Sequence, residues 1–334
     1  MLGEKHPNTL TMMANLAEIY QASGQRDKAE KLWQEHFKFS NKFLNQVLLG
    51  AGEKTRFAYL LQQENIKNNY LSFYSSRNSQ KMAVQAFNFS LTRKGQLLRI
   101  SSKVNMLAKN SQQPEIKALV EKFTSQKQLL ANLTISGIAD NKQLQELEEE
   151  LNNLEMQLSQ KVSSFQRSQQ EITPNDVLEK LSDKQVLVDF LFFKQVDFKK
   201  QQYKTIQLIA LVLDKKHGIK LIKLGDTQAI DTAIKTYRQQ ILPDEAGQLT
   251  NRKDILNPTS QKLYNLIWQP LLPYLANKTD VYLIPDGILH LLPFKALMDK
   301  HGHYLAESKQ ITLLTSAHTI TLNSQQCVNV RQFN

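Results

Sequence analysis

The chain has 334 residues, a formal net charge of +11, 41% hydrophobic residues and one cysteine, enough apolar material for two or three packed regions. A single cysteine excludes an internal disulfide framework. The opening residues lack a secretory signal, and no run approaches the roughly 20 apolar residues of a membrane span, so we expect a cytoplasmic protein without membrane contact.

Residues 6–40 show the pattern of two helices joined by a tight turn. Leu16, Ala17 and Tyr20 are predicted on one face of the first helix, and Gly24 lies in the turn. Ala29 permits close approach of the second helix. The positions that carry the pattern are Gly3, His6-Pro7, Thr9, Leu16-Ala17, Tyr20, Gly24, Ala29-Glu30 and Trp33.

This pattern resembles one tetratricopeptide repeat of the kinesin-light-chain kind. His36 and Asn41 depart from it, since the family prefers a small residue and a proline there, and we expect a last, capping repeat. About three repeats are needed to bury a stable core. The resemblance implies a surface for a protein or peptide partner, formed by Leu16, Ala17, Tyr20, Gly24, Ala29 and Trp33.

Residues 41–170 predict a helical region that is poor in glycine. Apolar positions between 57 and 66 predict one helix, and those between 84 and 100 predict another around Lys94-Gly95. Leucines then recur at alternating spacings of three and four within residues 140–166, which is coiled-coil periodicity. They are Leu144, Leu147, Leu151, Leu154 and Leu158, continued by Phe165.

Such a leucine seam needs a partner helix. The partner that we expect is the segment from Ile116 to Leu133 of the same chain, because about three heptads are marginal for an independent oligomer. The alternative is a second copy, which would make the seam a site of oligomerisation. The glutamates between 146 and 150 are interpreted as a solvated face rather than an acid site.

From residue 171 the pattern changes to strands. The apolar run from Val186 to Phe193 predicts a strand covered on both faces. Tyr203–Leu213 and Ile219–Leu224 predict two more strands joined by a hairpin turn. Helical spacing follows at 230–237 and again at 263–275. Strands interleaved with helices predict a layered α/β sheet.

The stretch from Val281 to Ala317 is the most informative of the chain. Val281 to Ile284 predicts a strand that Pro285 ends, Asp286-Gly287 predicts a turn, and a second apolar run follows at 288–292. Residues 311–314 predict one more core strand. The order indicates a hairpin-like unit followed by a strand.

This order resembles the CHAT domain, a caspase-like and separase-like peptidase module usually found behind tetratricopeptide repeats. The matching positions are Ile284-Pro285-Asp286-Gly287, Leu289, Leu292-Pro293-Phe294, Ala296-Leu297, Gly302, Tyr304-Leu305 and Ser316-Ala317. Together with the earlier strands, the resemblance spans about 172–322. It implies an α+α/β chain: a repeat-like hairpin, a helical region with a coiled-coil segment, the first half of a caspase-like sheet domain at 171–322, and a tail at 323–334.

A cysteine peptidase needs a thiolate, a histidine that generates it, and amides directed at the developing oxyanion. In the family, the histidine stands in a His-Gly setting and the cysteine in a Ser-Ala-Cys setting, both after the Ser-Ala step. Neither matches a position here, so the resemblance implies a chain that looks truncated before the catalytic pair, with no catalytic residue. Cys327 lies in a polar stretch and is interpreted as a surface thiol.

The remaining candidates predict no cofactor and no metal. His301 and His303 flank Gly302 and are spaced to touch one metal, but no third ligand is near in sequence. His290 and His318 have no positioned partner in the sequence. Short basic pairs such as Lys199-Lys200 read as charged loop tips, so we expect no dedicated nucleic-acid site despite the net charge.

Two functions follow. In the first, the chain is the N-terminal part of a repeat-regulated cysteine endopeptidase and is inactive as it stands. In the second, it is a non-catalytic scaffold that binds proteins through its helical repeats.

Overall fold

The computed structural model describes residues 6–77, 79–137, 139–163, 172–241 and 253–321. They divide into two compact units. The helical unit comprises residues 1–66 and 95–171, and the sheet unit comprises residues 67–94 and 172–334. The region predicted as helical at 41–170 is therefore shared between the two units.

The helical unit begins with a helical hairpin, α1 (Pro7–Ala22) and α2 (Arg26–Leu49). The His6 side chain accepts a hydrogen bond from the Asn8 amide and caps α1. Gly24 has φ +80°, which a residue with a side chain rarely adopts, and it turns the chain between the helices. Ala17 and Ala29 are fully buried and let α1 and α2 approach closely.

The other helices of this unit are α3 (Glu53–Gln62), α6 (Gln96–Asn110), α7 (Pro114–Ser136) and α8 (Asn141–Ser163). Helices α7 and α8 pack against each other and run antiparallel. Lys122 pairs with Glu150 and Lys161 with Glu115, which fixes this direction. The leucine seam of α8 thus has a partner helix within the chain, while pairing with a second copy stays a prediction.

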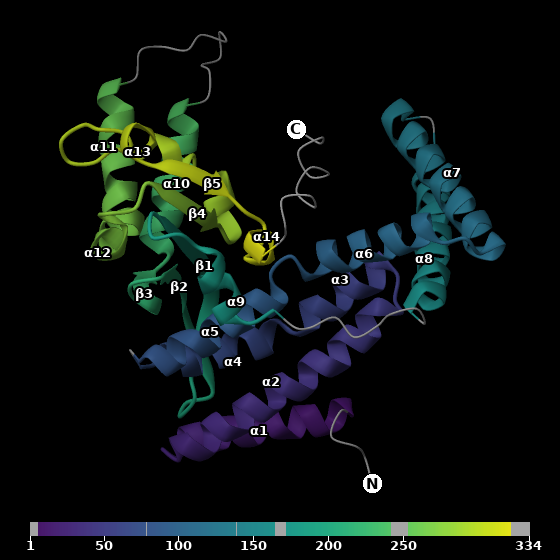
Figure 1. The fold of residues 1–334 in the computed structure, drawn as a ribbon, viewed down its shortest axis with the longest axis horizontal. Coiled ribbons are helices and arrows are strands. Elements are labelled where there is room, and N and C mark those ends of the chain that lie inside the picture. The colour runs from purple at the N-terminus through teal and green to yellow at the C-terminus, as the bar shows by residue number, and fades with distance from the viewer. Residues whose placement is uncertain (1–5, 78, 138, 164–171, 242–252, 322–334) are drawn as a thin grey trace. The chain divides into compact units, whose positions relative to one another are not determined.

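The sheet unit starts with α4 (Glu64–Ser75, most of which lies in this unit) and α5 (Gln80–Arg93) and continues from α9 (Pro174–Lys180). Its strands are β1 (Gln185–Asp197), β2 (Gln202–Asp214), β3 (Gly218–Asp226), β4 (Asp280–Ile284) and β5 (Gln310–Leu313). The sheet order is β3-β2-β1-β4-β5 (Figure 1). Strands β1, β2 and β3 are antiparallel, whereas β1, β4 and β5 are parallel. The predicted combination of helices with an α/β sheet is confirmed.

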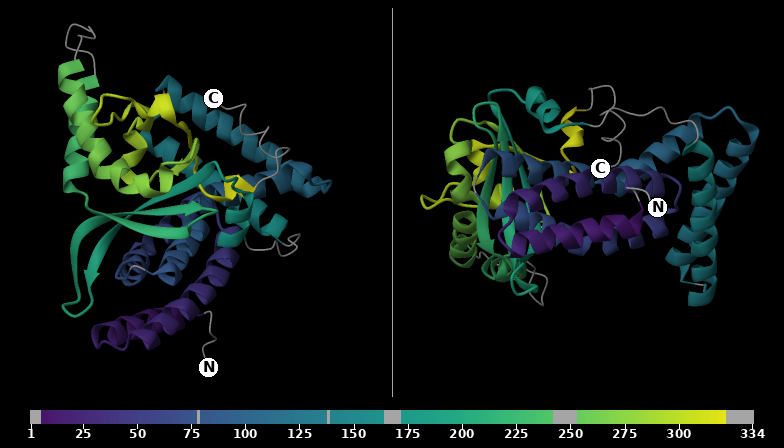
Figure 2. Two further views of the ribbon diagram at one scale, coloured as in Figure 1. Left: turned by 60° about the vertical axis from the view of Figure 1, so that its left-hand side comes forward. Right: turned by 90° about the horizontal axis from the view of Figure 1, so that it is seen from below.

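Strand β4 lies parallel to β1, and two parallel strands need a long crossover connection. The helices between β3 and β4 form most of this connection. They are α10 (Gln228–Ile241), α11 (Lys253–Leu263), the π-helical turn η1 (Tyr264–Trp268), η2 (Gln269–Leu271) and α12 (Leu272–Leu275). Strands β1 and β2 are the longest of the sheet and form the extended teal hairpin in the left view of Figure 2.

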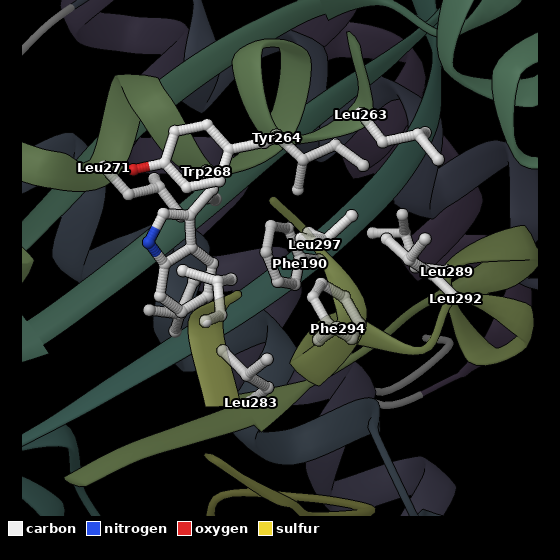
Figure 3. Close-up of a cluster of buried hydrophobic side chains, with 14 of the residues drawn as sticks. Phe190, Leu263, Tyr264, Trp268, Leu271, Leu283, Leu289, Leu292, Phe294 and Leu297 are labelled. Atoms are coloured by element: carbon white, nitrogen blue, oxygen red, sulfur yellow. The ribbon is translucent and has the colours of Figure 1, made fainter. Parts of the chain in front are cut away.

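Side chains of β1 alternate between two covered faces of the sheet. Val186, Val188 and Phe190 belong to the core beneath the crossover helices, together with Trp268 and Leu283 (Figure 3). The opposite face is covered by α4 and α5. There the Asn68 side chain accepts the Lys194 amide at 2.8 Å, and the Ser72 hydroxyl accepts the Val196 amide at 2.9 Å. Apart from Asp189, the buried β1 side chains on both faces are apolar, as the nearly continuous apolar run predicted.

One local prediction is wrong. The apolar run after Asp286-Gly287 is a 3₁₀ helix, η3 (Gly287–Leu291), and not the second arm of a hairpin. Asp286 caps η3, and Pro293 has no amide to give to a strand ladder. A second 3₁₀ turn, η4 (Phe294–Ala296), and two short helices, α13 (Leu305–Ser308) and α14 (His318–Thr321), complete the unit. In the described part of the chain, every helix is too short or too polar to span a lipid bilayer.

A buried arginine links four helices of the helical unit. Arg56 on α3 is fully buried, and its guanidinium donates to the Leu48 carbonyl at 2.7 Å, to Glu155 on α8 at 2.8 Å and to Ser101 on α6 at 3.1 Å. It also donates to Ser159 at 2.7 Å. A planar guanidinium satisfies several acceptors at once, so Arg56 fixes the relative position of α2, α3, α6 and α8.

We expect Arg56→Met to lower the free energy of unfolding by about 3–5 kcal/mol, because it leaves the Glu155 carboxylate buried without its cation. Urea denaturation followed by circular dichroism measures the change. The control is Lys122→Met, which removes an exposed ion pair and should cost less than about 1 kcal/mol. Equal losses in the two variants would contradict the assignment.

Candidate functional site

A carboxylate lies in the middle of the central strand. Asp189 of β1 is 1% exposed and stands between Val188 and Phe190, which are fully buried. A buried charge is costly unless it is paired and hydrogen-bonded. Its partners therefore identify the elements that this strand requires around it.

Lys94, directly after α5, supplies the opposite charge. Its Nζ lies 2.7 Å from Asp189 Oδ1, 3.3 Å from the Ile284 carbonyl and 3.2 Å from the Pro285 carbonyl. It also donates to the Phe190 carbonyl. Four oxygens thus share the three N–H donors of the ammonium. We call Ser90, Lys94 and Asp189 the lysine clamp, because Ser90, one turn earlier on α5, donates its hydroxyl to Asp189 Oδ2.

In the clamp, the pKa of Asp189 lies above its ordinary value. Burial raises the pKa of Asp189, the ammonium of Lys94 and the hydroxyl of Ser90 oppose this effect, and nearby Asp286 adds to it. The Lys94 side chain is 14% exposed. The Lys94 ammonium donates to oxygens of β1 and to carbonyls at the end of β4, so the clamp joins α5 to the middle of β1 and to the end of β4.

The Pro285-Asp286-Gly287 turn follows β4 and lies beside the clamp. Asp286 accepts the Phe192 amide at 2.8 Å and the Gly287 amide at 3.0 Å, which ties the turn to β1. Gly287 has φ +49°, and a Cβ there would lie 3.3 Å from the Phe192 ring. The positive φ favours glycine, and a Cβ would require the Phe192 ring to shift by a few tenths of an ångström.

The other CHAT-like positions are mostly core residues. Leu292, Phe294, Leu297 and Leu305 are at most 5% exposed, and the Phe294 ring stacks on Phe190 with centroids 5.8 Å apart (Figure 3). Two further positions bound short turns: Pro293 precedes η4, and Tyr304, 38% exposed, precedes α13. Ser316 is 3% exposed, and its carbonyl accepts the Thr319 amide. These residues share one unit, but they do not converge on one reactive centre.

The repeat-like positions lie in the α1–α2 hairpin of the helical unit. Ala17, Ala29 and Trp33 are fully buried, and the Tyr20 ring is half-buried with Lys28 Nζ 5.3 Å from its centroid. Leu16, which the resemblance places on the partner surface, is 41% exposed. It stands beside the exposed Met12 and Ile19 at helical spacing, on the face of α1 turned from the buried alanines.

The histidines form no catalytic arrangement in the described part of the chain. His290 is exposed, and His318 begins α14. The ring centroids of His301 and His303 are 6.3 Å apart, and the Asp299 carboxylate accepts hydrogen bonds from the backbone amides of both residues. Among the described residues, no group of three or more His, Cys, Asp or Glu side chains is placed to hold a metal. Cys327 lies outside the described residues.

Sequence reasoning missed the clamp, although one signal was present. Asp189 interrupts an otherwise apolar strand, and a charge in such a run predicts a buried counter-charge. The Lys94-Gly95 step resembles the Arg-Lys-Gly segment common ahead of CHAT domains, but the sequence assigns Lys94 no partner, and no pattern singles out Ser90. Their pairing with Asp189 spans 95 and 99 residues, and no local pattern indicates it.

We expect Lys94→Met to lower the free energy of unfolding by about 3–5 kcal/mol near neutral pH, because Asp189 stays buried without its cation. The loss should shrink as the pH falls. In this variant burial holds the folded pKa of Asp189 above its unfolded value, so protonation stabilises the fold at low pH and this contribution is lost as the pH rises through the folded pKa. Denaturation at several pH values measures the trend. The double variant Lys94→Met/Asp189→Asn should not show this pH dependence. A loss of stability in Lys94→Met that does not change with pH would contradict the pairing of Lys94 with Asp189.

A fragment of residues 171–334 should aggregate, because it lacks Lys94 and Ser90 and leaves Asp189 unpaired. Strand β5 also has one neighbour, β4, among the described strands, and Leu313 on it is 55% exposed. Size-exclusion chromatography and thermal melting check this, and a synthetic peptide of residues 67–94 should raise the soluble fraction. A monodisperse, cooperatively melting fragment would contradict the expectation.

Comparison with known proteins agrees with the resemblance noted in the sequence. No curated protein sequence matches the chain. The family match covers residues 257–332, so it includes the Pro285-Asp286-Gly287 turn, β4 and β5, and it leaves β1 to β3 and the helical unit outside. Residues 257–332 of this chain match the model of the CHAT domain family.

Proposed function

We propose that residues 1–334 supply the partner-binding helices and the opening strands of a repeat-regulated, caspase-like cysteine endopeptidase, and that they do not carry out proteolysis by themselves. In this proposal the helical unit receives a protein or peptide partner, and the sheet unit forms the scaffold of the peptidase fold. The CHAT match supports the class of protein.

One observation carries the non-catalytic part of the proposal. In parallel α/β sheets, reactive groups gather where strands end at their carboxyl termini. At the carboxyl end of β4, the described charged groups are Lys94, Asp189 and Asp286, and each is engaged in hydrogen bonds that join strands, turn and helix. The groups at this edge thus serve structure.

The position of Lys94 supports the proposed regulation of the peptidase by partner binding. Lys94 is the last residue of its segment in the sheet unit, and Gly95 is the first of the next segment in the helical unit. Gly95 has φ +65°, which suits an abrupt turn of the backbone. In this proposal, a partner that displaces α6 pulls on the residue that joins the middle of β1 to the end of β4.

The alternative is a scaffold protein that acts alone through its helices. The exposed apolar side chains of Met12, Leu16 and Ile19 on α1 favour it, since they form a stripe fit for a protein partner. The intact mass of the native product separates the two. A mass near 38.4 kDa favours the scaffold, and a product tens of kilodaltons heavier favours the peptidase.

We expect no thiol-dependent peptidase turnover from residues 1–334, because the chain has one cysteine and no described histidine is assigned to a nucleophile. Cleavage of a fluorogenic casein substrate, with and without iodoacetamide, measures this. The control is Cys327→Ala, which should match the unmodified chain. Turnover that iodoacetamide and Cys327→Ala both abolish would refute the proposal.

A further inference from the structure

A groove of about 220 Å³ lies in the helical unit, between α6, α7 and α8. Its floor is apolar. Ala108 and Leu158 are at most 3% exposed, and Val120 and Phe123 are half-buried and packed on the same core. The small side chain of Ala108 leaves space in the floor that a larger residue would fill.

The size of the groove limits what enters it. It exceeds the roughly 150 Å³ of a cavity that binds benzene and is smaller than the roughly 300 Å³ of the smallest drug-sized pockets. It therefore accepts one large apolar side chain rather than a cofactor or a metabolite.

Two cations stand at the rim. Lys109 at the end of α6 and Lys127 on α7 are exposed, and within the described residues neither makes an ion pair. Two other lysines of the α7–α8 hairpin do make ion pairs, Lys122 with Glu150 and Lys161 with Glu115. Glu121 lies on α7 but does not line the groove.

All charged side chains of α6 are basic, and Lys109 among them lines the groove. The helix carries Arg99, Lys103 and Lys109 and no acidic residue. An apolar pocket between unpaired cations is complementary to an apolar side chain between carboxylates. Nucleic acid fits less well, because it would need a line of phosphate contacts and offers no side chain for the apolar floor.

We propose that this groove docks an acidic amphipathic helix of a protein partner. One Phe or Leu of that helix fills the floor, and Asp or Glu residues one turn to either side meet Lys109 and Lys127. This site rests on the proposed binding of a partner by the helical unit and deepens it, since it places the partner on α6, α7 and α8 rather than on the repeat-like α1–α2 hairpin.

The test uses the full chain and a fluorescein-labelled helical peptide of Glu and Ala with one central Phe. Fluorescence anisotropy should show saturable binding that weakens with salt, because exposed charge pairs are screened. Replacing the Phe of the peptide by Ala should weaken binding by about tenfold or more. Thr124→Trp, which fills the mouth of the groove, should abolish it.

The charge of the rim is tested with Lys109→Glu/Lys127→Glu, which should weaken binding about tenfold through two lost exposed pairs. The matched control is Lys117→Glu, on the same α7 but outside the groove, and it should change affinity less than about twofold. Circular dichroism of each variant verifies that the helices are retained.

Three results would overturn the proposal. They are a Lys117→Glu effect equal to that of the rim variant, binding that does not depend on the Phe, and no saturable binding below about 1 mM. Displacement of the peptide by an oligouridylate would also overturn it and would assign the groove to nucleic acid.

Discussion

The sheet unit depends on one constraint, the burial of the Asp189 carboxylate inside its central strand. The charge has no access to water, so its cation must come from another element, and Lys94 provides it together with Ser90. The same ammonium engages carbonyls of β1 and at the end of β4. A single side chain therefore holds a helix, two strands and the turn at Pro285 in register.

The helical unit is organised in a similar way around Arg56. Glu155 pairs with it and also accepts the Glu53 amide at the start of α3. Buried ion pairs contribute little net stability against a well-packed apolar alternative, because desolvation offsets their attraction. Their value is geometric: an arrangement that leaves either charge unpaired is strongly disfavoured, so each unit has one preferred packing.

These two centres bear on what the chain can do. The charged groups described at the carboxyl end of β4 take part in hydrogen bonds that join strands, turn and helix. The features that remain open to partners lie on helices instead. They are an apolar stripe on α1 and a groove with a cationic rim between α6, α7 and α8. The partner-binding sites that we propose therefore both lie on helices.

The sequence by itself determined the elements and the family segment. Alternation, apolar runs and turn residues predicted all five strands and the crossover helices, because these signals are local and each strand or helix buries its own periodic face. The repeat-like turn at Gly24 and the CHAT-like order around Asp286 were readable for the same reason.

Only the tertiary structure decided which segments share a unit. Residues 67–94 look like part of a continuous helical region, yet they cover one face of the sheet because Asp189 requires Lys94 and Ser90. The run after Gly287 looked like a strand and is a 3₁₀ helix, because Asp286 caps it and ties it to Phe192. Each of these outcomes depends on a partner distant in the sequence, and periodicity carries no information about such partners.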